Sequence, residues 1–527
     1  MALEFRQGLV PDALKTELAV DAFLALFDQK IPLIPATIFE AMEKEEGLAH
    51  FAALAEIEAA FSVDELDALI NLSRKLPLLD ALLPHFEAAS LEQYHLFELH
   101  QFLTVTQELA AFEEALPVAD ACRGALDALM GTLERRTVCG RSLVMDGAVN
   151  GAKSKLAEVE KEVAAAISDH EKEVEKVLGL RMLYPFPREM DEGDVRLEKA
   201  EASPHLRVSR VGEYFRIDHV PGEALVDLEL KKQKITAELE EVTGLLLGQI
   251  NQELVAHVNA FKTVYFERKR RCLLYSLVFT KLKENFCLPQ FEETSGCTFQ
   301  LEGGLSFALT LKKGPGTVPL SLSLGEGANV LYGANMSGKT TVLKSVFFLL
   351  TAIRAGLPVP AGKIKLSFPE SVRLLLKSSG DLTKDLSSFG EELAFFAEEP
   401  ARGAFVLVDE LFLSTDPVNG AELSRIFIEE YAKRELIFLA TTHYPKVLEM
   451  KEAKLFRMLD VDVPEGATMD LSNLASLMPY QLEEVSSDRA LETVRGNRAP
   501  LKLALCFDLP QSIKNSIQSK LNASVEK

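Results

Sequence analysis

Apolar residues recur at helical spacing through the first quarter of the chain. Residues 51–61 (FAALAEIEAAF) and 66–83 (LDALINLSRKLPLLDALL) place apolar side chains three or four positions apart, and prolines separate such segments. This periodicity predicts an all-helical region over about residues 10–135, which we expect to form an N-terminal helical domain of residues 1–135.

Two long, charge-rich segments follow. Residues 152–179 are rich in Ala, Glu and Lys with opposite charges three or four positions apart, which is typical of a long exposed helix or of one arm of a coiled coil. A second such arm runs over about residues 225–265, and residues 206–220 (LRVSRVGEYFRIDHV) between them predict a short β-hairpin. The pattern predicts a helical lever over residues 136–286, with two antiparallel arms that protrude and carry the hairpin.

The pattern changes after Pro289. Residues 299–313 (FQLEGGLSFALTLKK) and 318–324 (VPLSLSL) alternate as strands do, and further along the chain strands alternate with helices. We expect a doubly wound α/β domain over residues 287–460, followed by a C-terminal helical segment over residues 461–527, with short helices and a polar tail from about residue 479.

Length and composition indicate a folded protein with several cores. The 527 residues are 47% hydrophobic, and their net charge of −22 argues against a role in coating nucleic acid through a generally basic surface. The 6 cysteines are scattered without CxxC spacing, which favours reduced thiols over a disulfide framework or a zinc site. No leader and no apolar run long enough to span a bilayer is visible, so we expect a cytoplasmic protein.

The strongest chemical signal is a full GxxxxGK[ST] motif between an apolar strand (residues 328–332) and a helical segment. Backbone N–H groups of such a loop, and the N-terminus of the helix, face phosphate oxygens. We expect Lys339 to neutralise the β and γ phosphates of ATP and Thr340 to ligate Mg²⁺. The nucleotide-binding residues predicted here are Gly333, Ala334, Asn335, Met336, Ser337, Gly338, Lys339, Thr340 and Thr341.

Two further apolar strands end in polar residues. Residues 404–408 (AFVLV) lead into Asp409 and Glu410, at the end of a strand where α/β sheets place ligand chemistry. With a phosphate loop upstream, we expect Asp409 to hold Mg²⁺ and Glu410 to polarise the water that attacks the γ phosphate. Residues 436–440 (LIFLA) lead into Thr-Thr-His, where a neutral His443 would sense the γ phosphate or orient that water. Taken alone, either strand end also fits an ordinary core or surface position.

In their order along the chain, these motifs resemble those of the MutS-type ATPases, relatives of the ABC class. The resemblance rests on GANMSGKTT (333–341), VPA (359–361), SSFGEE (387–392), VLVDE (406–410) and ATTHY (440–444), and it extends more weakly over about residues 150–515. It implies an α/β P-loop ATPase domain of the ABC/MutS type, a mixed sheet with flanking helices, preceded by an all-helical lever and clamp region. It also implies Mg²⁺-dependent ATP hydrolysis, with ATP and Mg²⁺ bound.

The resemblance further implies a homodimer. In the family the ATPase domains pair, and a serine-containing segment of one subunit completes the nucleotide site of the other, so Ser387 and Ser388 would be contacts in trans. Residues 210–217 look like the clamp hairpin of the family, and residues 461–527 would be a C-terminal dimerisation segment.

Several positions depart from the family pattern. Ala334 stands where the family usually has Pro, residues 411–417 (LFLSTDP) replace Gly-Arg-Gly-Thr-Ser, and Asn419 replaces an aspartate. These changes leave phosphate binding intact and bear on the coupling between subunits. Residues 1–60 contain no Phe-x-Glu, so we expect a small member that lacks the N-terminal mismatch-reading domain, and also the nuclease domain that some members append.

Two functions follow from the resemblance. In the first, the protein is a homodimeric clamp that binds mismatched, branched or otherwise irregular DNA in repair or recombination, and couples ATP binding and hydrolysis to clamp opening and closing. In the second, the ATPase acts on a protein client, such as an adenosylcobalamin-dependent aminomutase that it reactivates. Hairpin arginines Arg207, Arg210 and Arg216 and the basic run at 268–271 favour DNA if they reach phosphates, whereas a solvated or ion-paired run would be structural.

Overall fold

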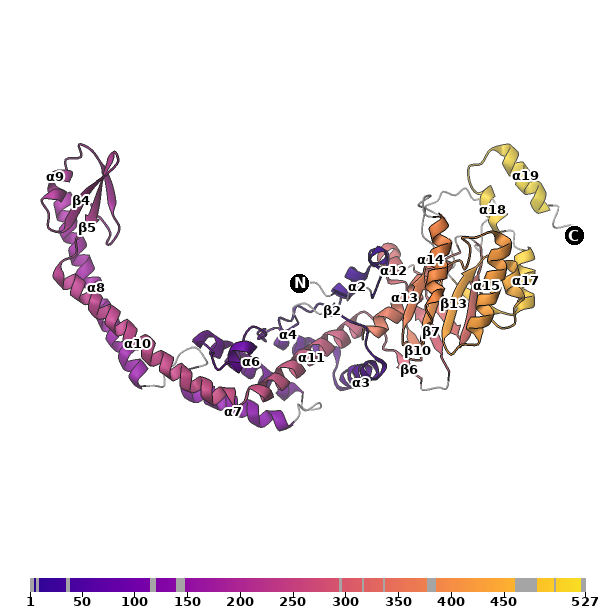
Figure 1. The fold of residues 1–527 in the computed structure, drawn as a ribbon, viewed down its shortest axis with the longest axis horizontal. Coiled ribbons are helices and arrows are strands. Elements are labelled where there is room, and N and C mark those ends of the chain that lie inside the picture. Colours follow the sequence, from indigo (N-terminus) through magenta and orange to yellow (C-terminus); the bar gives the residue numbers. More distant parts are fainter. Residues whose placement is uncertain are drawn as a thin grey trace. The chain divides into compact units, whose positions relative to one another are not determined.

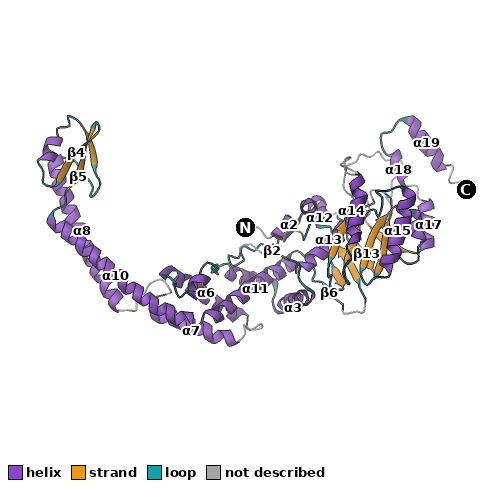
Figure 2. Ribbon diagram, in the orientation of Figure 1, coloured by secondary structure: helices purple, strands orange, loops and turns teal. Residues whose placement is uncertain are grey.

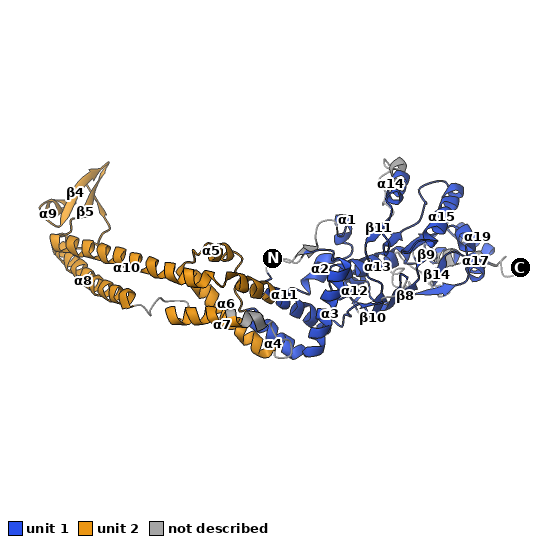
Figure 3. Cartoon of the chain, turned by 60° about the horizontal axis from the view of Figure 1, so that its bottom comes forward, with its two compact units in different colours: residues 1–74, 269–527 blue, residues 75–268 orange. Residues whose placement is uncertain are grey.

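The structure is a computed structural model that describes residues 4–5, 9–34, 38–113, 120–138, 147–292, 296–314, 317–334, 337–376, 385–459, 481–496 and 499–522. The chain forms two compact units: unit 1 comprises residues 1–74 and 269–527, and unit 2 comprises residues 75–268 (Figure 3). This division is coarser than the four predicted segments, whose boundaries stay predictions. It groups the first 74 residues with the α/β part of the chain.

A six-stranded sheet forms the centre of unit 1 (Figure 1). Its order is β11-β12-β13-β9-β14-β15, and all neighbouring pairs are parallel except β14 with β15. Every residue of β9, β12 and β13 is buried, because these strands are covered on both faces, and their apolar runs are therefore continuous. The strands are β9 (Gly327–Tyr332), β11 (Val372–Leu375), β12 (Phe405–Val408), β13 (Ile437–Thr442), β14 (Lys454–Met458) and β15 (Leu482–Val485). The sheet thus continues past residue 460, where the α/β domain was predicted to end.

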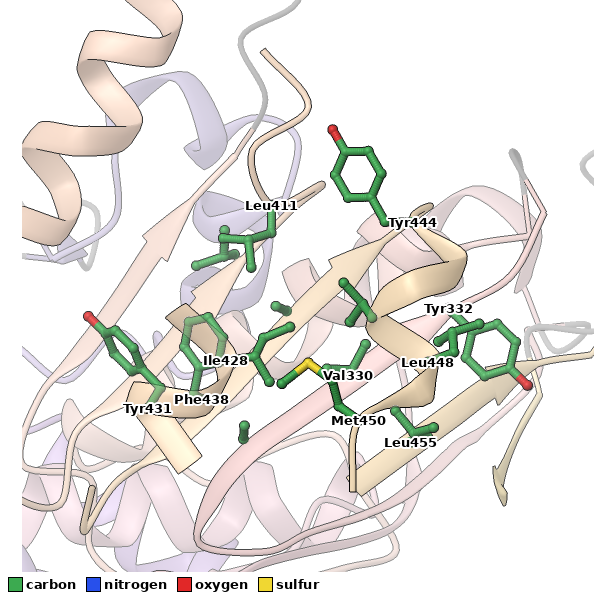
Figure 4. Packing of buried hydrophobic residues seen from close by; sticks show 14 of the residues in the cluster. Val330, Tyr332, Leu411, Ile428, Tyr431, Phe438, Tyr444, Leu448, Met450 and Leu455 are labelled. Atoms are coloured by element: carbon green, nitrogen blue, oxygen red, sulfur yellow. The ribbon is translucent and has the colours of Figure 1, made fainter. Parts of the chain in front are cut away.

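Helices lie on both faces of this sheet (Figure 2). α13 (Lys339–Arg354) contacts β11, β12 and β13, whereas α15 (Pro417–Ala432) adds Ile428 and Tyr431 to a core that includes Val330 and Phe438 (Figure 4). The remaining helical elements of this part are α14 (Asp385–Ala397), the 3-10 helix η2 (Pro445–Glu449), α17 (Ser487–Gly496), α18 (Ala499–Leu505) and α19 (Gln511–Asn522). The mixed sheet with flanking helices agrees with the predicted fold class.

A second, four-stranded sheet has the order β6-β10-β7-β8 and consists of β6 (Gln290–Phe291), β7 (Phe299–Gly304), β8 (Leu320–Leu324) and β10 (Lys363–Leu366). The strand prediction is confirmed for β7 and β8 and wrong for the segment between them, which forms α12 (Phe307–Lys313). The reason is tertiary: the Phe307 ring lies 5.2 Å from that of Phe23 and stacks on Phe348, while Leu311 is left 56% exposed.

The N-terminal segment of unit 1 packs on α13. The Phe23 and Phe348 rings are 4.9 Å apart, and Lys344 of α13 forms an ion pair with Glu17. The elements of this segment are β1 (Glu4–Phe5), α1 (Asp12–Lys15), α2 (Val20–Ala25), β2 (Ile38–Phe39), α3 (Lys44–Ala60) and α4 (Val63–Ser73). The helical prediction is confirmed here, apart from the short parallel pair of β1 and β2.

A hydrogen bond of His50 connects α3 to the segment that follows α13. The Nε2 atom of His50 lies 2.9 Å from the carbonyl oxygen of Gly356, which has φ +75°. A Cβ on Gly356 would lie 2.6 Å from Met42 Cε and 2.9 Å from His50 Nε2, so only glycine fits this junction. Burial lowers the pKa of His50, although the hydrogen bond to Gly356 opposes this effect.

Because His50 is buried, we expect the protein to lose stability as the pH falls. Because the folded state lowers the pKa of His50, its neutral form stabilises the fold fully above the unfolded pKa of about 6.5, and this stabilisation is lost as the pH falls toward the folded pKa. In His50→Gln the residue no longer titrates. We expect the thermal midpoint of this variant to fall less between about pH 7.5 and about pH 5.5 than that of the unchanged chain. Equal falls in both proteins would contradict the prediction.

Unit 2 contains the two predicted arms and the hairpin. α8 (Gly147–Leu178) packs along α10 (Glu223–Val255), and Lys231 and Lys232 form ion pairs with Glu162 and Glu160 at 3.4 and 3.1 Å. A three-stranded sheet of order β3-β5-β4 contains the hairpin. The elements are β3 (Arg188–Asp191), α9 (Leu197–Glu201), β4 (Leu206–Val211) and β5 (Tyr214–His219), with α5 (Leu83–Glu87), α6 (Gln93–Phe112) and α7 (Asp120–Arg136) elsewhere in the unit. None of the described helices is both long and apolar enough to cross a membrane.

The second arm differs from its prediction. It was expected over about residues 225–265, but α10 ends at Val255 and α11 (Val258–Lys283) begins after a short break. Neither residue of the break is Gly or Pro, so the sequence gives no signal for it. Within α11, the guanidinium of Arg268 is 1% exposed and forms an ion pair with the equally buried Glu113. The first arginine of the basic run is therefore structural.

Candidate functional site

The carboxyl ends of three adjacent strands bring the predicted site residues together. Thr442 at the end of β13 pairs with Tyr332 at the end of β9, and β12 pairs with β13 on its other side. Asp409 follows β12, His443 follows β13, and the glycine-rich loop follows β9. This edge is where parallel α/β sheets hold ligands.

The loop after β9 turns directly into α13. Gly338 has φ +102°, a left-handed conformation that glycine adopts without strain, and it is the N-cap of α13. A Cβ on Gly333 would lie 2.8 Å from Met458 Cβ and 3.0 Å from Ser337 Oγ. Both glycines of the motif are therefore required by the path of the chain.

Lys339 points back into this loop. Its Nζ donates hydrogen bonds to the carbonyl oxygens of Gly333 at 3.0 Å and Ala334 at 3.1 Å, and the residue is only 5% exposed. Burial lowers the pKa of Lys339, whereas the nearby carboxylates of Glu410 and Asp409 raise it. The ammonium group is thus enclosed by the loop and faces the two carboxylates.

Asp409 is fixed by two threonine hydroxyls. Thr340 Oγ1 donates to Asp409 Oδ2 at 2.8 Å, and Thr441 Oγ1 donates to Asp409 Oδ1 at 2.9 Å. Thr441 also accepts a hydrogen bond from the backbone N–H of Glu410 at 2.7 Å and is fully buried. A hydroxyl and a carboxylate side by side are the hard oxygen ligands that Mg²⁺ prefers.

Glu410 and His443 contact each other. The Nε2–H of His443 donates to Glu410 Oε1 at 2.9 Å. Burial lowers the pKa of His443, the positive charge of Lys339 lowers it further, and Glu410 opposes both effects. The imidazole is therefore neutral near pH 7 and can hold a carboxylate by donation from one nitrogen.

The turn after Asp409 is strained. Glu410 has φ +54° and Phe412 has φ +52°, in the left-handed region that costs a non-glycine residue on the order of 1–3 kcal/mol. The carbonyl of Leu411 accepts a hydrogen bond from Ser424 Oγ at 3.1 Å, and Leu413 N–H bonds to the Glu410 carbonyl at 3.2 Å. Such strain persists only where the surroundings fix it, and it is frequent at functional sites.

Five of the predicted nucleotide-binding residues are not among the described residues of the hydrogen-bond network around Asp409 and Glu410. Asn335 and Met336 lie outside the described residues. Ser387 and Ser388 belong to the first turn of α14, and their side chains are also outside the description. Thr341 lies in the first turn of α13 and is half-buried.

Sequence reasoning missed Thr441 and Tyr444. Thr441 links Asp409 to Glu410, and its signal was its place in ATTHY (440–444), two residues before His443. Tyr444 borders a cavity of about 250 Å³ that adjoins the glycine-rich loop. The cavity is lined by residues from the ends of β9, β13 and β14 and from α17, among them Gly333, Ala334, His443, Tyr444, Arg457 and Val494.

The fold and the site define an α/β domain with a ligand edge at the ends of β9, β12 and β13. The family model for MutS domain V matches residues 329–490, which contain β12, β13 and most of β9. Over these residues the chain is similar to the MutS family.

Among curated proteins, the chain is similar to three that are named Endonuclease MutS2. It is 32% identical over 216 residues to that of Anaeromyxobacter sp. (strain Fw109-5), 28% over 228 residues to that of Carboxydothermus hydrogenoformans, and 25% over 306 residues to that of Gemmatimonas aurantiaca. These alignments cover 39%, 42% and 57% of this chain, but only 26%, 28% and 34% of the relatives. The chain thus matches about a third or less of the length of these relatives.

Proposed function

We propose that this chain binds ATP and hydrolyses it with Mg²⁺ at the edge of the six-stranded sheet. The observation that carries the proposal is the convergence of separate strand ends. Lys339 and Thr340 come from the loop after β9, Asp409 and Glu410 follow β12, and hydrogen bonds of 2.8 and 2.9 Å join Thr340 to Asp409 and His443 to Glu410. Residues far apart in the chain are brought together with the chemistry that phosphoryl transfer needs.

The residues present fit a bound nucleotide. Ser337 Oγ is buried and has no hydrogen-bond partner among the described residues, so it has the capacity to donate to a phosphate oxygen. The ammonium of Lys339 is bonded to two neutral carbonyl groups, which phosphate oxygens would replace as stronger, charged partners. The N-terminus of α13 adds backbone N–H groups and a favourable dipole.

Each side chain of the site would have a separate role in hydrolysis. Thr340 and Asp409 would hold Mg²⁺, which neutralises charge on the phosphates when it is bound. Glu410 would accept hydrogen bonding from the attacking water and polarise it, and His443 holds the Glu410 carboxylate through its Nε2–H. Lys339 would neutralise the charge that develops on the γ phosphate.

We further propose that the chain acts on DNA as a homodimer, in repair or recombination, with the hairpin of β4 and β5 as a contact to the phosphate backbone. Two hairpin arginines are already paired, Arg210 with Glu192 at 3.3 Å and Arg216 with Asp218 at 2.9 Å. Arg207 is exposed, so it is the hairpin arginine to which we assign a phosphate contact. No comparison supports a protein client.

Salt dependence tests the DNA contact. If Arg207 neutralises a phosphate, Arg207→Ala should weaken binding to branched duplex and reduce the slope of log Kobs against log salt by about 1. Arg196→Ala is the matched control, because its guanidinium is held by both carboxylate oxygens of Asp194, at 2.8 and 2.9 Å. Equal slopes for both variants, or no binding of branched DNA by the unchanged chain, would refute this contact.

A further inference from the structure

Aromatic packing holds the side chain of Phe412 in the strained turn. The ring is fully buried, and its centroid lies 4.8 Å from that of Phe427 on α15. The ring centroids of Phe396 and Phe389, both on α14, lie 5.6 and 6.3 Å from that of Phe412. The ring is therefore held between two helices and resists movement of the turn.

A side-chain hydrogen bond holds the backbone of the same residue. Tyr444 Oη donates to the Phe412 carbonyl at 2.9 Å, and Tyr444 is 8% exposed. Gly420 makes room for this contact, because a Cβ there would lie 2.3 Å from Tyr444 Oη and 2.5 Å from the Phe412 oxygen. Since Tyr444 directly follows His443, the bond joins the loop after β13 to the turn after β12.

We propose that Tyr444 is a positioning residue for Glu410. By holding the Phe412 carbonyl, its hydroxyl keeps the turn in the left-handed conformation in which the Glu410 carboxylate reaches His443. Without the hydroxyl, the Phe412 carbonyl loses this partner, the turn relaxes toward an ordinary φ, and Glu410 moves away from His443. This inference rests on the proposed ATP hydrolysis and deepens it by adding a residue that acts through Glu410.

Tyr444→Phe tests the proposal with the loss of one oxygen atom. We expect kcat for ATP to fall about tenfold or more, because a small displacement of a reacting group has a large effect on rate. The Kd for a non-hydrolysable ATP analogue should change less than about twofold. Amide exchange of a peptide covering residues 409–413 should become faster, which reports on the turn without any need for hydrolysis.

Tyr431→Phe is the matched control. Tyr431 is buried in the same core, and its ring lies 4.5 Å from that of Phe438 (Figure 4). This variant should leave kcat, Kd and exchange of the turn unchanged. The role of Tyr444 is overturned if Tyr444→Phe turns over ATP at the original rate, if it loses affinity as much as rate, or if the turn exchanges as before. An unchanged chain that hydrolyses no ATP overturns the proposed function instead, and the exchange measurement tells the two failures apart.

Discussion

Lys339→Ala should abolish tight nucleotide binding. The ammonium donates hydrogen bonds to two carbonyl groups of the glycine-rich loop, and in the proposed complex it would exchange these partners for phosphate oxygens. Hydrogen bonds to a charged group are worth about 1.5–3 kcal/mol each, so the loss of two corresponds to an increase in the Kd for ATP of at least about a hundredfold. Equilibrium binding of a fluorescent ATP analogue measures this change.

Lys344→Ala is the matched control for this variant. Lys344 lies on the same helix, α13, but its Nζ forms an ion pair with Glu17, away from the loop. Its loss should leave the Kd for ATP unchanged, because partly exposed pairs of this kind contribute little even to stability. Tight ATP binding by Lys339→Ala would remove Lys339 from the nucleotide site and with it the assignment of the phosphate loop.

Glu410→Gln should bind ATP and stall before hydrolysis. The amide oxygen of glutamine can still accept the hydrogen bond from His443 Nε2, so the local geometry is kept while the negative charge is lost. General base catalysis contributes about 10²–10⁴-fold, and we expect kcat to fall by a factor in that range while the Kd for ATP stays within about threefold. Phosphate release and nucleotide binding, measured on one preparation, separate the two effects.

The control for Glu410→Gln is the same substitution at Glu422. This carboxylate lies on α15, is 49% exposed and pairs with Lys446 at 3.4 Å, outside the network around Asp409. Glu422→Gln should hydrolyse ATP at the original rate. Unchanged turnover by Glu410→Gln would mean that another group polarises the water.

The residues of the candidate site were predicted from the sequence because they lie in short, recognisable sequence patterns. A glycine loop between a strand and a helix, and carboxylates after a continuous apolar strand, are visible in short windows of sequence. Strand order is not visible in such windows, and it is the shared edge of the parallel strands that brings Lys339, Asp409 and His443 to one side of the sheet. At this edge hydrogen bonds join Thr340 to Asp409 and Glu410 to His443.

The remaining features depend on contacts between distant segments. The segment that forms α12 alternates like a strand, but burial of Phe307 against Phe23 and Phe348 makes it a helix. No local sequence pattern indicates the left-handed conformation of Phe412, because this conformation depends on aromatic residues of α14 and α15 that pack against the ring. The sequence also gives no sign that Arg268 is buried. Its position in a basic run suggests a solvated side chain, but in the structure it forms a buried ion pair with Glu113.

Steady-state release of phosphate from ATP, measured with Mg²⁺ and with or without branched duplex DNA, is the direct test of ATP hydrolysis at this site. The unchanged chain and Glu410→Gln are measured side by side, so that a contaminating ATPase appears equally in both. We expect turnover by the unchanged chain at least about a hundredfold above that of Glu410→Gln. Equal phosphate release by the two proteins, with and without DNA, would contradict it.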